Sequence, residues 1–246
     1  MKKMISLLKE VKKTFDAYNI PFWLEGGTLL GAIRDGRVIP WDDDIDLAAF
    51  YDDAYREIEN ISKYFFDLGF DVFNSRTKIS FRKKDVSLSI FLYDHGDYIK
   101  RAKVTKKNEL VKKFYYVFMQ GLIAPHRDYI HKMSLRQRLI QIAKNSMMPL
   151  PGRKQIYELL LRFWDKSGLL IVYDINVSSD CTKELKLINF CDIKVNVPIK
   201  SEKYLEHFYG KEWRIPDENW SQNDQIRRMK KLQKELNSKK KLEKTK

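Results

Sequence analysis

The chain lacks the residues and segments that mark several common classes of protein. It contains two cysteines, Cys181 and Cys191, among 246 residues, and its four histidines show no zinc-type spacing. A disulfide scaffold and a structural zinc site are therefore excluded. No apolar run approaches the roughly 20 residues of a transmembrane helix, and the N-terminus lacks the apolar stretch and small-residue cleavage site of a signal peptide. We expect the protein in a reducing cytoplasm.

The composition is that of an ordered protein with an uneven distribution of charge. Hydrophobic residues make up 43% of the chain and aromatic residues 13%, which is enough for a packed core. The net charge is +14, yet residues 1–60 carry 8 Lys and Arg against 12 Asp and Glu, whereas residues 226–246 carry 10 against 2. An acidic segment in a basic body fits a metal-bound anionic substrate together with an anionic acceptor or membrane surface.

A nucleic-acid-binding module without enzymatic activity would also be basic, so this alternative has to be compared with the rest of the sequence. A cluster of aspartates repels phosphates unless a metal intervenes, and the chain has no RRM, KH or helix-turn-helix signature. We therefore expect no nucleic acid among the partners.

Hydrophobic periodicity predicts one α+β domain over residues 1–225, in which a mixed β-sheet is backed by helices. The expected elements, in chain order, are a helix at 1–18, a strand at 21–25, a helix at 28–34, a strand centred on 44–47, a helix at 51–68 and strands at 70–73, 78–83 and 86–93. The first helix buries the stripe that consists of Met4, Leu8, Val11, Phe15 and Tyr18.

The second half of the chain predicts additions to this core. Residues 104–166 are expected to form a mostly helical insertion that borders the side of the site where the acceptor substrate binds. Residues 169–198 return to the alternating pattern of β-strands. Ser201 can cap a further helix that Gly210 closes. Residues 226–246 form a basic helix and tail, by default a solvated surface.

The apolar positions of that tail leave a second interpretation open. Ile226, Met229, Leu232 and Leu236 fall on one stripe of the helix. A basic helix with such a stripe can dock on an anionic membrane surface, and this would place the protein at the inner face of the cytoplasmic membrane.

Residues 23–46, WLEGGTLLGAIRDGRVIPWDDDID, contain the pattern that points to chemistry. Gly26 and Gly27 stand at the mouth of a short helix, where backbone N–H groups can approach a phosphate closely. Asp44 and Asp46 flank one apolar residue, so in a strand both carboxylates point to the same face. Two such oxygens, together with phosphates, suit Mg²⁺. The pattern predicts a metal-dependent phosphoryl or nucleotidyl transferase, although an acidic triplet by itself is more often a solvated turn.

Two separated motifs in this chain resemble those of the LicD family, whose animal relatives include fukutin and the fukutin-related protein. The first consists of GGTLLGAIR at residues 26–34 and IPWDDDID at residues 39–46. The second is Val197-Pro198 followed by YLEHFYGKEWRIP at residues 204–216. Two matches in the right order are far more specific than a glycine pair alone.

The resemblance implies a nucleotidyltransferase-like fold and a particular reaction. LicD-like enzymes transfer the phospho-alcohol of a CDP-activated choline, ribitol or glycerol to a hydroxyl of a glycan or lipid-linked glycan, with release of CMP. Asp44 and Asp46 would hold Mg²⁺ or Mn²⁺, and Asp42 would hold a second metal ion or orient the acceptor. A metal ion on the diphosphate would neutralise the charge that develops on the departing phosphate.

The resemblance also implies roles for the residues around the glycines. Gly26, Gly27 and Thr28 would hold phosphates through backbone N–H groups and the hydroxyl, and Arg34 would clamp a phosphate. Arg34 can equally be a surface helix residue, and Glu25 can contact the metal site or pair with Arg34.

One position departs from the family pattern. A third carboxylate is expected on a neighbouring strand, and Ser89 stands there instead. The carboxylates nearest to this position are Asp85 and Asp94, at the two ends of the expected strand.

One further interpretation of the chemistry stays open. The enzyme could instead transfer a nucleotide from a nucleoside triphosphate to a sugar or small molecule, which would release pyrophosphate in place of CMP.

The aromatic residues near the C-terminus are expected to be structural. Tyr209, Trp213 and Trp220 would pack the last helix against the core, with no part in the chemistry.

Overall fold

The computed structural model describes most of the chain. The described residues are 2–94, 98–106, 127–147, 151–166, 170–221, 224–225, 227–229, 231–232, 235 and 238. Every structural statement below concerns these residues.

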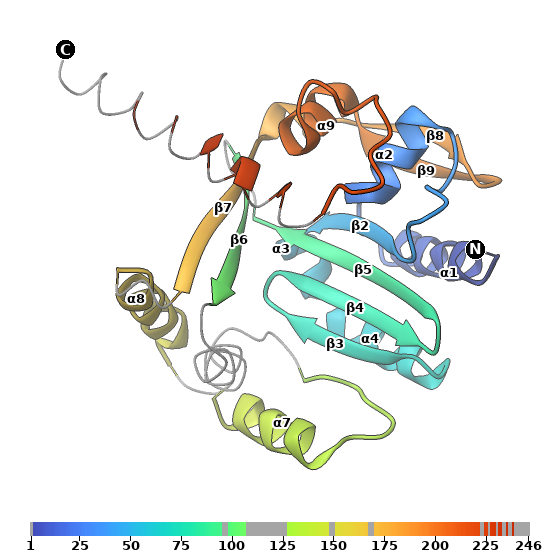
Figure 1. Ribbon diagram of the computed structural model, residues 1–246. Coiled ribbons are helices and arrows are strands. Elements are labelled where there is room, and N and C mark those ends of the chain that lie inside the picture. Colours follow the sequence, from blue (N-terminus) through green and yellow to red (C-terminus); the bar gives the residue numbers. More distant parts are fainter. Residues whose placement is uncertain are drawn as a thin grey trace.

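A five-stranded mixed sheet forms the centre of the protein (Figure 1). Its strand order is β1-β2-β5-β4-β3, in which β2 and β5 are parallel and the other neighbours are antiparallel. The strands are β1 Phe22–Leu24, β2 Ile45–Phe50, β3 Asp71–Ser75, β4 Lys78–Lys83 and β5 Val86–Tyr93. The expected order of elements and the α+β fold class are confirmed.

Helices cover one face of this sheet. These are α1 Lys2–Ala17, α3 Tyr51–Tyr55 and α4 Ile58–Asp67, which lie behind the sheet in Figure 1. Ser62 of α4 exchanges hydrogen bonds with Asn74 of β3, and Leu88 and Ile90 of β5 are fully buried on this side. Because side chains alternate along a strand, Ser87 and Ser89 point to the opposite face.

A second group of elements lies beside β1 and β2. It contains α2 Gly26–Arg34, the hairpin of β8 Leu185–Phe190 and β9 Ile193–Pro198, and α9 Ser201–Tyr209. Gly210 follows α9 with a positive φ of 95° and donates its N–H to the Glu206 carbonyl, so it closes this helix as expected. Ser201 does not cap α9, because its hydroxyl donates to the carbonyl of Pro198.

The structure corrects two predicted helices near the core. Tyr18 lies beyond the end of α1 and is 40% exposed, whereas the other four apolar positions expected along this helix are buried. The helix expected at 51–68 is two helices, α3 and α4, separated at Arg56 and Glu57. The break lets each helix turn its own apolar side inward: α3 buries Ala54, and α4 buries Ile58, Ile61, Ser62 and Phe65.

The described part of the insertion is mostly helical, as expected, but its first residues form a strand. It contains α7 Leu135–Met147 and α8 Arg153–Lys166, but residues 104–106 belong to the strand β6 Tyr98–Lys106. β6 pairs with β7 Leu170–Ser178, which closes the two ends of the insertion into a separate two-stranded sheet. Residues 107–126, expected to be helical, lie outside the described residues. Among the helices that are described, none is both long and apolar enough to cross a bilayer.

The buried face of α1 provides a test of this packing. Leu8 is fully buried, so Leu8→Ala is expected to lower the free energy of unfolding by about 2–5 kcal/mol. Leu135→Ala removes the same atoms from a side chain that is 74% exposed, and it should change the free energy by no more than about 0.5 kcal/mol. Urea unfolding of both variants measures the difference, and equal effects would contradict the described packing of α1.

Candidate active site

Two hydrogen bonds attach β2 to the corner between β1 and α2. The N–H of Glu25 donates to the carbonyl of Asp46 at 2.9 Å, and the N–H of Asp46 donates to the Thr28 hydroxyl at 2.9 Å. Thr28 is buried. Its hydroxyl therefore helps to position β2.

The glycine pair is required by the close approach of two carboxylates. A Cβ atom on Gly26, whose φ is +53°, would lie 3.0 Å from Oδ2 of Asp46. A Cβ atom on Gly27 would lie 2.4 Å from Oδ2 of Asp42, which is well inside van der Waals contact. The predicted phosphate-binding glycines therefore lie directly against the predicted metal-binding aspartates.

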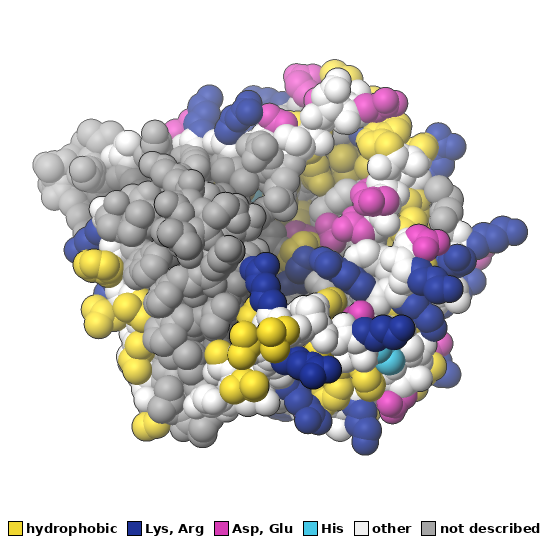
Figure 2. Space-filling model, turned by 60° about the horizontal axis from the view of Figure 1, so that its bottom comes forward, with side chains coloured by type: hydrophobic (Ala, Val, Ile, Leu, Met, Phe, Trp, Pro, Cys, Tyr) yellow, Lys and Arg dark blue, Asp and Glu magenta, His cyan; other side chains and the backbone are white. Residues whose placement is uncertain are grey.

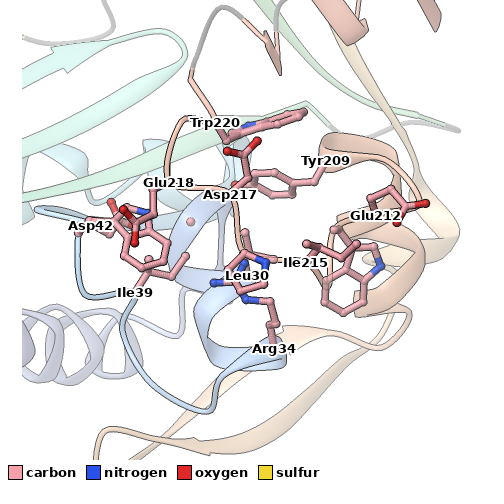
Figure 3. A pocket seen from close by; sticks show the side chains of 14 residues that line it. Leu30, Arg34, Ile39, Asp42, Tyr209, Glu212, Ile215, Asp217, Glu218 and Trp220 are labelled. Carbon is pink, nitrogen blue, oxygen red and sulfur yellow. The ribbon is translucent and has the colours of Figure 1, made fainter.

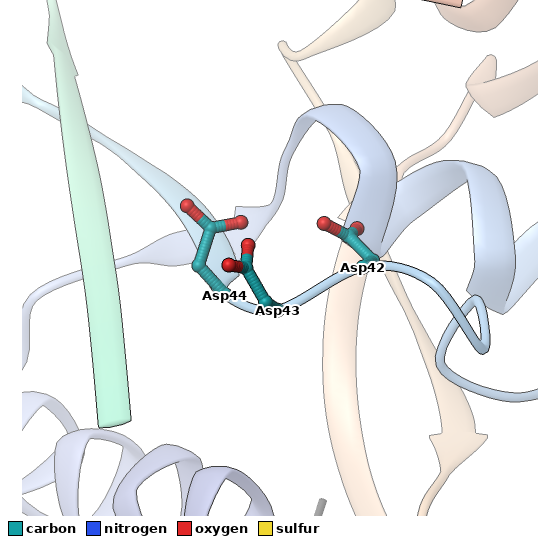
Figure 4. Close-up of side chains that lie close together, drawn as sticks. All are labelled: Asp42, Asp43 and Asp44. Carbon is teal, nitrogen blue, oxygen red and sulfur yellow. The ribbon is translucent and has the colours of Figure 1, made fainter. Parts of the chain in front are cut away.

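Three consecutive aspartates form a group just before β2. One carboxylate oxygen from each of Asp42, Asp43 and Asp44 lies within 4.8 Å of the others, as Figure 4 shows. Asp43 is absent from the residues that the sequence pattern singles out, because it points away in an ideal strand. The irregular backbone before Ile45 brings it back toward its neighbours.

Crowding changes the acidity of the group. Burial, reinforced by the charges of Asp44 and Asp43, raises the pKa of Asp42 to about 7. Burial also raises the pKa of Asp44, with a further contribution from Asp43 and opposing contributions from Lys78 and Arg82. A divalent cation would relieve this repulsion and find three carboxylates within reach.

Asp46 lies beside the position where a third carboxylate is expected. In the sheet register Asp46 of β2 is aligned with Ser89 of β5, and Ser89 is aligned with Ser80 of β4. The two carboxylates at the ends of β5 are engaged elsewhere: Asp85 pairs with Lys3 of α1 at 3.4 Å, and Asp94 pairs with Arg76.

Basic residues occupy the same open face further along the sheet. Lys78 and Arg82 lie two residues before and two residues after Ser80 on β4, so their side chains share its face of the sheet. The positive charges of both residues oppose the rise in the pKa of Asp44. Figure 2 shows Lys and Arg side chains beside Asp and Glu side chains on this side of the molecule.

Two tyrosine hydroxyls hold the carboxylate of Glu25. Its side chain is buried, and it accepts hydrogen bonds from the hydroxyls of Tyr93 at 2.8 Å and Tyr204 at 2.5 Å. Arg34 instead makes a two-pronged pair with Asp35, at 2.9 and 2.8 Å. Because Tyr204 belongs to α9, Glu25 connects the C-terminal part of the chain to the site.

A pocket of about 630 Å³ opens next to the aspartates, between α2, the loop before β2 and residues 209–220 (Figure 3). Its lining consists of Gly27, Leu30, Arg34, Ile39, Trp41, Asp42, Tyr209, Glu212, Trp213, Ile215, Pro216, Asp217, Glu218 and Trp220. Four carboxylates against one guanidinium make this pocket acidic within a chain of net charge +14.

The three aromatic residues expected only to pack α9 are part of this pocket. Tyr209 and Trp220 are in ring contact at 5.5 Å, and Trp213 is buried. Burial, followed by the charges of Glu25, Asp46 and Asp42, raises the pKa of the Tyr209 hydroxyl, so this side chain remains a neutral donor near the aspartates. The sequence interpretation of packing is therefore incomplete. The acidic and aromatic residues within 209–220 are the signal that could have revealed the pocket wall.

The raised pKa of Asp42 predicts how stability depends on pH. Because its folded pKa of about 7 lies above the ordinary 3.8, the folded state binds the proton more tightly than the unfolded state. The stability of the metal-free protein should therefore fall as the pH rises from about 4 to 7. Asp42→Asn has no carboxylate at this position and should not lose this stability. In the presence of a chelator, the difference in melting temperature between Asp42→Asn and wild type should therefore grow as the pH rises from about 4 to 7 and then stay constant.

Thermal unfolding from acidic to alkaline pH measures this effect. Asp52→Asn, at an exposed position on α3, removes the same charge away from the cluster and should follow the wild-type profile. A constant difference between Asp42→Asn and wild type at every pH would contradict the raised pKa.

Comparison with known proteins places this site in a family. A model described as LicD/FKTN/FKRP, nucleotidyltransferase domain, matches residues 19–141, which is half of the chain and includes the glycine corner, the aspartates and the first half of α7. The human protein named ribitol-5-phosphate transferase FKTN is 27% identical over 222 residues, which cover 87% of this chain but only 34% of that protein.

Other comparisons are more restricted. The lipopolysaccharide cholinephosphotransferase LicD of Haemophilus influenzae is 35% identical over 98 residues, or 32% of this chain and 37% of that protein. A crystal structure of ANT(2")-Ia with adenylyl-2"-tobramycin gives a TM-score of 0.32 at 26% identity, over 39% of this chain and 52% of that one, a likeness too low to add to the fold assignment. The chain thus spans about a third of the length of the fukutin relatives it matches, and by its family match it belongs to the LicD/FKTN/FKRP nucleotidyltransferase-domain family.

Proposed function

We propose that the chain transfers a phospho-alcohol from a CDP-activated donor to a hydroxyl of a cell-surface glycan, with release of CMP, in the cytoplasm. The observation that carries this proposal is the contact between the aspartates and the glycine corner. There Gly27 leaves room for Asp42, and Gly26 leaves room for Asp46. The names of the relatives, which specify ribitol phosphate and choline phosphate transfer, support a phospho-alcohol as the transferred group.

The donor set at the start of β2 fits Mg²⁺ or Mn²⁺. Asp42 and Asp44 would hold the ion together with Asp43, whose carboxylate lies within 4.8 Å of theirs. Asp46 lies outside this group of three, against Gly26, and would add its oxygen from that side. When bound, the ion would neutralise negative charge on the diphosphate and on the departing CMP. Hard divalent cations prefer such carboxylate oxygens.

The chain's own groups would orient the reacting phosphate. Backbone N–H groups of Gly26, Gly27 and Thr28 form the first turn of α2, where the helix favours negative charge. Arg34 uses only part of its guanidinium on Asp35 and lines the pocket, so donors remain for a phosphate or hydroxyl oxygen. Asp42 would orient the acceptor hydroxyl.

The bond changes follow from this arrangement. The acceptor oxygen forms a bond to the phosphorus that carries the alcohol, and the bond from that phosphorus to the oxygen of CMP breaks. The proton of the acceptor hydroxyl passes to a carboxylate of the group. The pocket beside Asp42 would receive the organic part of the donor, since its rings can stack and its carboxylates can accept hydrogen bonds.

Nucleotidyl transfer is the second candidate, because the family model describes a nucleotidyltransferase domain. The products separate the two reactions: phospho-alcohol transfer releases CMP, whereas nucleotidyl transfer from a triphosphate releases pyrophosphate. Binding of nucleic acid is a weaker alternative, because the aspartates and the acidic pocket oppose a polyanion.

The reaction can be tested with a panel of donors. The purified protein, Mg²⁺ or Mn²⁺ and a crude cell-envelope polysaccharide fraction are incubated with CDP-choline, CDP-ribitol or CDP-glycerol. We expect one donor to yield CMP. Asp44→Asn and Asp46→Asn should lower the rate by roughly 100-fold or more, because each removes a metal-binding oxygen. Asp52→Asn should remain active.

Three outcomes would contradict the proposal. Release of pyrophosphate from a nucleoside triphosphate would favour nucleotidyl transfer. Release of CMP that survives in both aspartate variants would mean that these carboxylates do not hold the catalytic ion. Absence of both CMP release and metal-dependent binding of CDP would remove the phosphotransferase assignment.

The contact at Gly27 gives an independent test of the metal site. In Gly27→Ala the added methyl group would displace Asp42, so affinity for Mn²⁺ should fall by roughly tenfold or more. In Gly36→Ala no atom lies within 4 Å of the added methyl group, and the φ of +66° strains only the local backbone. This control should lower the stability somewhat but leave the affinity unchanged. Calorimetric titration measures both variants, and unchanged Mn²⁺ binding by Gly27→Ala would argue against Asp42 as a ligand.

A further inference from the structure

Helix α7 attaches to the protein through its polar side. Lys144 is buried and pairs with Asp128 at 2.7 Å, and its ammonium group also donates to the carbonyl of Asn74. The side chain of Gln141 accepts the N–H of Asp128 at 2.9 Å. These contacts hold α7 beside the open face of the sheet, next to β3.

The outer side of the same helix is apolar. Leu135, Leu139 and Ile142 are 74%, 57% and 61% exposed, and their spacing of four and three residues places them on one stripe. A helix on the surface of a water-soluble domain normally has the reverse arrangement, with its apolar stripe toward the core. α1 has that normal arrangement, whereas α7 exposes its apolar side.

Helix α8 repeats this pattern. Ile156, Leu159 and Phe163 are 42%, 70% and 65% exposed, at a spacing of three and four residues that again defines one stripe. In Figure 1, α7 lies at the bottom of the molecule and α8 at its left, both away from α1 and α9.

Charge identifies the kind of partner that suits these stripes. α7 carries Arg136, Arg138 and Lys144 and no acidic residue, and both arginines are exposed. Figure 2, which brings this end of the molecule forward, shows hydrophobic side chains together with Lys and Arg side chains. A basic helix with an exposed apolar stripe lies in the headgroup region of an anionic bilayer, where the apolar atoms leave water and the cations meet phosphates.

The basic tail, where the sequence suggested membrane docking, is a poorer candidate in the structure. Met229 is buried in the core, and Leu232 packs against it. Two of the four stripe residues therefore face the protein. The other two, Ile226 and Leu236, lie outside the described residues.

We propose that α7 and α8 form a docking surface for a bilayer that contains anionic phospholipid. The surface consists of Leu135, Leu139, Ile142, Ile156, Leu159 and Phe163 with the flanking Arg136 and Arg138. The docking itself does not depend on the proposed reaction.

Docking would nevertheless serve that reaction. A pocket of about 400 Å³ lies between α7 and the open face of β3 and β4, and its lining includes Ser80, Lys78 and Arg136. Ser80 is in register with Ser89, which is in register with Asp46. If the proposed function holds, a lipid-linked acceptor at α7 would therefore reach the aspartates along one face of the sheet.

Vesicle flotation with the full chain tests the docking surface. We expect the protein to float with vesicles of phosphatidylcholine and phosphatidylglycerol, and to bind vesicles of phosphatidylcholine alone far less. The triple variant Leu135→Gln, Leu139→Gln, Ile142→Gln should lower the vesicle partition coefficient by roughly tenfold or more. Arg138→Gln should lower it by roughly fivefold.

Matched controls separate this surface from general stickiness. Leu187→Gln on β8 replaces a side chain that is 61% exposed, as Ile142 is, and should bind like wild type. Leu159→Gln with Phe163→Gln probes α8 by itself and keeps the test valid if the α7 variant unfolds, which circular dichroism would reveal.

Several results would overturn the proposal. One is the absence of wild-type binding to anionic vesicles. Another is binding that both sets of variants retain but that deletion of residues 239–246 removes, which would return docking to the tail. A wild-type dimer that the triple variant converts to a monomer, without vesicle binding, would assign the surface to a second copy of the chain. Because flotation needs no donor or metal, failure of the phosphotransferase assignment would leave this result unaffected.

Discussion

The site depends on the two hydrogen bonds that join the backbone of Asp46 to the corner between β1 and α2, one to the N–H of Glu25 and one to the hydroxyl of Thr28. They fix the first turn of α2 against the start of β2, next to the aspartates. This close approach is possible only because Gly26 and Gly27 have no Cβ, since a methyl group on either would touch a carboxylate oxygen. The N–H groups of the first turn of α2 and the carboxylate oxygens are thus held close together, which is the preorganisation that phosphoryl transfer needs.

The same arrangement is electrostatically unfavourable when no cation is bound. Partial burial and mutual repulsion raise the pKa values of Asp42 and Asp44, and Lys78 and Arg82 offset only part of this at Asp44. The surrounding structure holds the carboxylates together regardless, through the buried sheet and through Glu25, whose own burial is compensated by two tyrosine hydroxyls. Strain of this kind persists only where the rest of the fold over-determines it, and a bound cation would relieve it.

Most of the core and the centre of the site could be predicted from the sequence, because the signals are local. Glycines before a helix, carboxylates at i and i+2 and the alternation along β5 need no knowledge of distant residues. What escaped prediction depends on non-local contacts. Tyr204 reaches Glu25 across 179 positions in the chain, the pairing of β6 with β7 spans the whole insertion, and Trp220 becomes a pocket wall only when α9 docks. Asp43 joins the group because the backbone before β2 is irregular.

The two sides of the site differ in polarity and charge. This difference suggests how a water-soluble substrate and a membrane-bound substrate could reach the same aspartates. On the β1 and β2 side, an acidic and aromatic pocket opens to water between α2 and residues 209–220. On the β3 and β4 side, serines and cations lead along the sheet to α7, whose outer stripe is apolar. A water-soluble nucleotide donor would enter from the first side. An acceptor confined to a membrane would come from the second, where docking raises its effective concentration without any new contact to the reacting atoms. The two proposed routes would converge at the aspartates.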